Sequence, residues 1–137
     1  MRKITVALAF LVIPVGLLLA QVEHADIQMR VKDSATSALN SYFSFIESGS
    51  ILDLVEGVSH SAKTEAYLEL IQEGTDEVEA EKMNGIVNGF GRLCGDIALD
   101  FASDPEIVRN DPGFATFLTI MKVWTEDQFG ELPGLRY

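Results

Sequence analysis

Cysteine is almost absent from this sequence, and its scarcity limits how the fold can be held together. Cys94 is the only cysteine among 137 residues, so an intramolecular disulfide is impossible. No cysteine follows the apolar run at the start of the chain, which excludes a lipid-modified anchor of the bacterial lipoprotein type. An apolar core must therefore stabilise the fold, and residues 22–137 are enough to build one.

Basic residues are also scarce. Apart from Arg2 and Lys3, all charged residues follow residue 20, and these comprise 8 basic and 21 acidic side chains with a net charge of −13. Such a surface repels phosphate backbones and anionic lipid, so nucleic-acid binding is not expected. The same charge would attract a basic protein or divalent cations. The alternative interpretation is that it serves solubility alone.

Residue patterns typical of catalysis or metal binding are missing. His24 lies between Glu23 and Asp26, but the three side chains at this spacing do not all lie on one face of a helix. His60 lies between two serines, whereas a catalytic triad is assembled in space rather than along the chain. The acidic run at 65–81 lacks the helix-loop-helix calcium pattern. We therefore predict no catalytic, cofactor or metal residues, and a protein that is not an enzyme.

An uninterrupted apolar segment is present at the N-terminus. Residues 4–20 contain sixteen apolar or small residues and one threonine, after a basic start. This arrangement predicts a signal peptide or a signal-anchor transmembrane helix over residues 1–21. Cleavage after Ala20 is weakened by Leu18, and a retained helix would span about 25 Å. Both alternatives place residues 22–137 outside the cytoplasm. The predicted anchor residues are Ile4, Phe10, Leu11, Leu17, Leu18 and Leu19.

The remaining residues have the periodicity of amphipathic helices. Helices are predicted over 22–48, 51–56, 62–73, 76–102 and 112–128, with a further turn or two after Asp104-Pro105. Gly57 and Gly74 are predicted helix ends, and Thr75 a helix cap. The fold class is therefore all-α, a small bundle of four to five helices preceded by the N-terminal signal or anchor helix.

Four glycines interrupt the predicted helix at 76–102, namely Gly85, Gly89, Gly91 and Gly95. Each costs about 1 kcal/mol relative to alanine inside a helix. They indicate either close packing against another helix or a break, and we favour a single helix with close packing. Cys94 continues the apolar stripe of this helix, so a buried and unreactive thiol is expected.

The most distinctive surface feature is the acidic run from Glu65 to Glu81, with seven carboxylates between Lys63 and Lys82. Glu65, Glu69 and Glu73 are spaced to form one outward ridge. The predicted partner-binding residues are Glu65, Glu69, Glu73, Asp76 and Glu77. The sequence thus favours an extracytoplasmic interaction protein, either an accessory subunit tethered beside a membrane protein complex or an inhibitor-like partner.

Aromatic residues of the first and last helices suggest an alternative function. They are expected to form the core between these helices, and they are Tyr42, Phe43, Phe45, Phe114, Phe117 and Trp124. The same residues could instead line a pocket that holds an apolar ligand within the bundle. A helical binding module for such a ligand is therefore the second hypothesis.

Overall fold

A computed structural model describes the backbone of residues 2–137 and the side chains of residues 25–97, 100 and 103–137. Within this part of the chain all regular structure is helical, as the periodicity predicts. The elements are α1 (Arg2–Ser48), α2 (Ile51–Glu73), α3 (Glu77–Lys82), α4 (Asn84–Cys94), α5 (Asp96–Ser103), α6 (Pro105–Asn110) and α7 (Pro112–Phe129).

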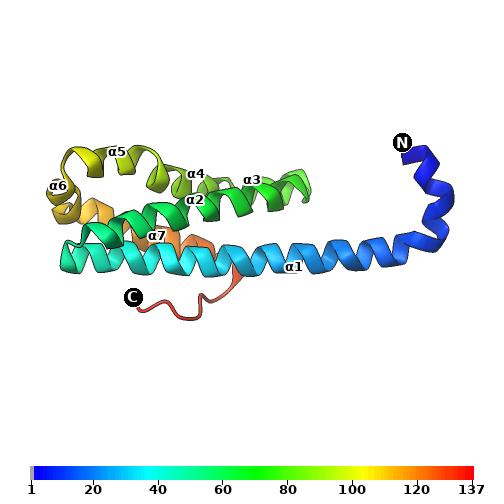
Figure 1. Ribbon diagram of the computed structural model, residues 1–137, viewed down its shortest axis with the longest axis horizontal. Coiled ribbons are helices and arrows are strands. Elements are labelled where there is room, and N and C mark those ends of the chain that lie inside the picture. Colours follow the sequence, from blue (N-terminus) through cyan, green and yellow to red (C-terminus); the bar gives the residue numbers. More distant parts are fainter. Residues whose placement is uncertain (1) are drawn as a thin grey trace.

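The four longest helices form an antiparallel bundle (Figure 1). α1 packs against α2 and α7, and α4 packs against the same two helices on the other side. Each helix runs opposite to the preceding long helix, which gives the up-down-up-down order common in helical bundles. The short helices α3, α5 and α6 make the connections. The all-α prediction is confirmed.

Helix α1 supplies one side of the core, as the amphipathic periodicity of residues 22–48 predicts. A stripe of completely buried side chains runs along it, formed by Val31, Ala35, Ala38, Leu39, Tyr42 and Phe45. The Tyr42 ring meets Phe114 of α7 edge to face, with ring centroids 5.8 Å apart. Side chains of the two helices therefore fill the interior here, as expected of an aromatic core.

The end of α1 at Ser48 agrees with the prediction. Two local features stabilise this helix end. Gly49 has a φ of 71°, the left-handed conformation that ends many helices. The Arg109 guanidinium of α6 donates hydrogen bonds to the carbonyl oxygens of Ile46 and Glu47 at 3.0 and 2.9 Å. These carbonyls belong to the last turn, where a helix leaves its acceptors without backbone donors.

Helix α2 differs from the prediction, because it is continuous through Gly57. The sequence predicts a short helix ending at this glycine and a second helix from residue 62, but α2 runs without a break to Glu73. Gly57 is buried, and a Cβ atom there would lie 2.8 Å from Cε1 of Tyr42. The glycine is needed for contact with α1 rather than for ending a helix. The predicted end at Gly74 is correct.

The single helix predicted over 76–102 is also wrong, since it is divided into α3, α4 and α5. The first break is at Met83, whose side chain is only 1% exposed and packs in the core. The second is at Gly95, whose backbone leaves the helical region (φ −111°, ψ −92°). The hydroxyl of Tyr42 donates to the carbonyl oxygen of Leu93 at 3.0 Å and so satisfies an acceptor in the last turn of α4.

Both Asp-Pro starts are confirmed. Asp104 caps α6 through a hydrogen bond from the Ile107 amide, and Asp111 caps α7 by accepting from the Gly113 amide. In each case the proline occupies the first turn, where its missing N–H costs nothing. The irregular tail after α7 lies along α1 (Figure 1), held by hydrogen bonds between the Asn40 amide and the backbone of residues 134 and 136.

Candidate functional site

The carboxylates predicted to bind a partner lie on the second half of α2 and on α3. We call this region, with all seven carboxylates from Glu65 to Glu81, the acidic surface. The exposed members are Glu69, Glu73, Asp76, Glu77 and Glu81, whereas Glu65 and Glu79 are half-buried. The turn between Gly74 and Asp76 joins the two helices, so carboxylates from both helices extend around one end of the bundle.

Asp76, rather than Thr75, caps α3. Its carboxylate accepts a hydrogen bond from the backbone amide of Glu79 at 2.9 Å. The Thr75 hydroxyl instead donates to the carbonyl oxygen of Gln72 in the last turn of α2. The prediction of Thr75 as the cap is therefore wrong by one residue, because its hydroxyl is used to finish the preceding helix. Asp76 has a structural role in addition to its charge.

Helix α3 is only six residues long and depends on its neighbours, since helices this short are unstable alone. The Gln72 side-chain amide donates at 2.8 Å to the Ala80 carbonyl oxygen and at 2.8 Å to Oδ1 of Asn84. Met83, directly after α3, is buried in the core. These contacts attach the second half of α3 to the bundle, and Asp76 caps its first turn, so the carboxylates of α3 are held in a defined position.

Few opposite charges face the acidic surface. Among the residues that the structure describes, its only ion pair joins Lys82 Nζ to Glu79 Oε1 at 3.0 Å. Apart from Asp76, whose carboxylate caps α3, the exposed carboxylates of this surface extend toward solvent. Since this pair involves one of the seven carboxylates, the surface retains most of its negative charge.

Glu65 departs from the predicted outward ridge. Its carboxylate leans over Gly91 of α4, in the space that a Cβ atom would occupy. Burial raises the pKa of Glu65, and the nearby charge of Glu69 raises it further. Glu65 therefore belongs to the contact between α2 and α4, whereas Glu69 and Glu73 remain available on the outer face.

A shallow pocket of about 530 Å³ adjoins α3 within the acidic surface, lined by Gln72, Glu77, Val78, Ala80, Glu81 and Asn84. Val78 is 64% exposed and stands among the carboxylates. The surface thus combines an apolar contact with negative charge. A partner would need both basic and apolar side chains to match it.

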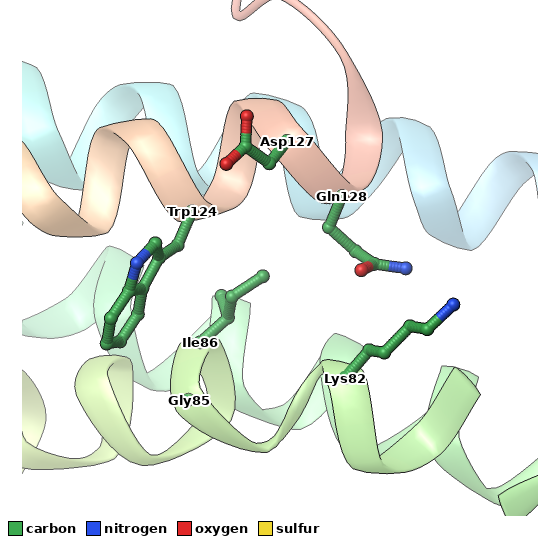
Figure 2. Close-up of a pocket in the computed structure, with 6 residues that line it drawn as sticks. All are labelled: Lys82, Gly85, Ile86, Trp124, Asp127 and Gln128. Carbon is green, nitrogen blue, oxygen red and sulfur yellow. The ribbon is translucent and has the colours of Figure 1, made fainter. Parts of the chain in front are cut away.

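A second cleft, of about 310 Å³, lies on the other side of the junction between α3 and α4. Figure 2 shows Trp124 extending from α7 on one side of it, Ile86 in the middle, and Lys82 and Gln128 on the opposite side. Trp124 is predicted to be a core residue, but its side chain is 47% exposed. Thr125 is buried in its place and donates to the Met121 carbonyl oxygen. The sequence pattern does not predict this cleft.

The other candidates from the sequence line neither of these two pockets. His60 lies within α2 rather than in a linker, and His24 falls outside the described side chains. Cys94 is half-buried, and burial together with the charge of Glu65 raises the pKa of its thiol. Among the described side chains, no group of three His, Cys, Asp or Glu residues could hold a metal ion.

The predicted anchor residues in 4–20 also lie outside the described side chains. In the part of the chain whose side chains the structure describes, none of the helices is both long enough and apolar enough to cross a bilayer. No family model, curated protein or solved structure matches this chain.

Proposed function

We propose that this chain is a non-enzymatic, extracytoplasmic interaction protein whose acidic surface binds a basic protein. It would act as an accessory subunit tethered beside a membrane complex or as an inhibitor-like partner. One observation carries the proposal: the exposed carboxylates of α2 and α3 are held on a fixed frame and have almost no basic neighbours. Binding by this surface requires no bound cofactor.

Electrostatics supports a basic partner. Residues 21–137 have a net charge of −13, so long-range attraction would accelerate the encounter with a positively charged surface. The close contacts of Gln72 with Ala80 and Asn84 fix α3 before binding, which reduces the entropy lost on association. Such an interaction should weaken as salt is added, since the exposed charges are screened.

The location of the acidic surface supports a partner near the membrane. Because Thr64 bonds to Ser34 and Arg30 lies over the Tyr67 ring, the second half of α2 lies beside the middle of α1. The acidic surface is thus at the end of the bundle where α1 leads back to the apolar segment at 4–20. If that segment is a retained anchor, the surface faces proteins embedded in the same membrane.

The proposal can be tested by charge reversal with a matched control. One variant carries lysine at positions 69, 73, 77 and 81; the control carries lysine in place of Asp33, Glu56, Asp100 and Glu131, which are exposed elsewhere. Both changes alter the net charge equally. We expect the native partner, quantified by mass spectrometry after affinity purification from membrane and soluble fractions, to be lost from the first variant only. Equal recovery with both would refute the proposal.

A further inference from the structure

The second cleft, which we call the Trp124 cleft, directly adjoins the acidic surface. Lys82 ends α3 and lines the cleft, while Glu77 and Glu81 on the same short helix line the acidic pocket. A segment that crosses α3 would therefore meet carboxylates first and the cleft next. One bound segment could therefore contact the acidic surface and the Trp124 cleft together.

The indole of Trp124 is fixed in position by α4. Gly85 leaves room for the ring, since a Cβ atom at this residue would lie 3.1 Å from Cζ3 of Trp124. Ile86, which is 2% exposed, forms the apolar floor between the indole and the polar side (Figure 2). A rigid, half-exposed tryptophan beside an apolar floor presents a preformed surface to a planar or branched side chain.

The polar side of the cleft can bind a peptide backbone. Gln128 and Lys82 extend toward each other opposite Trp124 (Figure 2), and Lys82 is also paired with Glu79. Asp127 and Gln128 also line the cleft. The Gln128 amide can therefore both donate to and accept from the backbone of a segment lying over the cleft, whereas the Asp127 carboxylate can only accept.

We infer that the Trp124 cleft receives one large apolar or aromatic side chain of the same basic partner segment that binds the acidic surface. The inference rests on the proposed function and adds the specificity that charge alone lacks. Tryptophan is among the residues that contribute most to the binding energy of protein interfaces. The volume of about 310 Å³ is at the lower end for ligand pockets, which suits a single side chain.

Charge complementarity favours a protein segment over a free small molecule. The cleft borders on the acidic surface, and the domain as a whole carries a charge of −13, which repels anionic ligands. A basic segment gains attraction from the carboxylates while its apolar side chain is desolvated against Trp124. One segment of a partner can thus bind the acidic surface and the Trp124 cleft at the same time.

The test uses the full chain in detergent and a displayed library of twelve-residue peptides without tryptophan. Trp124 is the only tryptophan, so its fluorescence reports binding at the cleft directly. We expect enrichment of peptides that combine several Lys or Arg residues with one large apolar residue. Binding of the synthetic peptides should change the Trp124 emission.

Variants then separate the cleft from the charges. Trp124→Ala should weaken peptide binding about tenfold or more, and replacing the apolar peptide residue by alanine should cause no further loss in that variant. Val123→Ala is the matched control, because Val123 is equally exposed at 47% but does not line the cleft. Gly85→Ala, which displaces the indole without removing it, provides a second variant if Trp124→Ala fails to fold by circular dichroism.

The outcomes are distinguishable. Basic peptides that bind Trp124→Ala and the original protein equally would overturn the cleft inference and leave the proposed function standing. Absence of basic peptides among the binders, or equal binding by the variant with lysine at positions 69, 73, 77 and 81, would overturn both. A small molecule found by native mass spectrometry in the purified chain and displaced by the peptide would show that the cleft has a different occupant.

Discussion

The α1–α2 hairpin and helix α4 both place glycine where helices meet, but the two contacts have different rigidity. Gly57 of α2 faces the ring of Tyr42, which is buried and hydrogen-bonded. Gly91 of α4 faces the carboxylate of Glu65, the movable end of a half-buried side chain. The same residue type therefore marks a fixed contact in one region and an adaptable contact in the other, which the sequence alone does not distinguish.

The largest effect should come from removing the Tyr42 hydroxyl, which fixes the rigid contact. It donates to the Leu93 carbonyl oxygen and accepts from the Ser61 hydroxyl at 3.1 Å. Tyr42→Phe leaves both buried partners without this bond, at a cost of about 2 kcal/mol in unfolding free energy. Urea denaturation measures the loss. A change below about 0.5 kcal/mol would show that the hydroxyl contributes little to the hairpin.

A smaller loss is expected from Gly57→Ala. The substitution gains about 1 kcal/mol of helix propensity, but its methyl group would meet the Tyr42 ring at 2.8 Å. Overpacking of this kind costs about 1–3 kcal/mol, so the net result should be a destabilisation of about 1 kcal/mol. Thermal unfolding provides the measurement. A raised melting temperature would mean that Tyr42 can move and that the two contacts do not differ.

The spacing of apolar residues and the capping residues predict those features of the helices that depend on neighbouring residues in the sequence. The buried stripe from Val31 to Tyr42 was found from apolar spacing, and the starts of α6 and α7 from proline after a capping aspartate. These features are predictable because each depends on residues within one or two turns.

Features that depend on contacts between distant residues were predicted less well. Gly57 was interpreted as a helix end because its partner Tyr42 lies fifteen residues away in sequence, and the break at Met83 follows from burial rather than from a capping motif. The acidic surface was evident from charge. The Trp124 cleft was not, since Trp124 continues the apolar spacing of α7 and only packing against Gly85 shows that it is half-exposed.

The smallest predicted effect is a gain, from Gly91→Ala at the adaptable contact. The new methyl group would displace the Glu65 carboxylate toward solvent, and alanine favours the helix, so a stabilisation of about 0.5 kcal/mol is expected at pH 7. Gly57→Ala is the matched control, since the same substitution meets a fixed ring there.

The gain at Gly91 should also depend on pH. Burial raises the pKa of Glu65 in the folded protein, so the folded state loses stability as pH rises from the ordinary carboxyl range through this raised pKa. If the Glu65 carboxylate is exposed in Gly91→Ala, the variant does not lose this stability. The increase in unfolding free energy caused by Gly91→Ala should therefore be larger at pH 7 than at pH 4. Denaturation at both pH values, together with NMR titration of Glu65, tests this. An unchanged Glu65 pKa in the variant would show that the carboxylate stays in place and that the α2–α4 contact is as rigid as the α1–α2 contact.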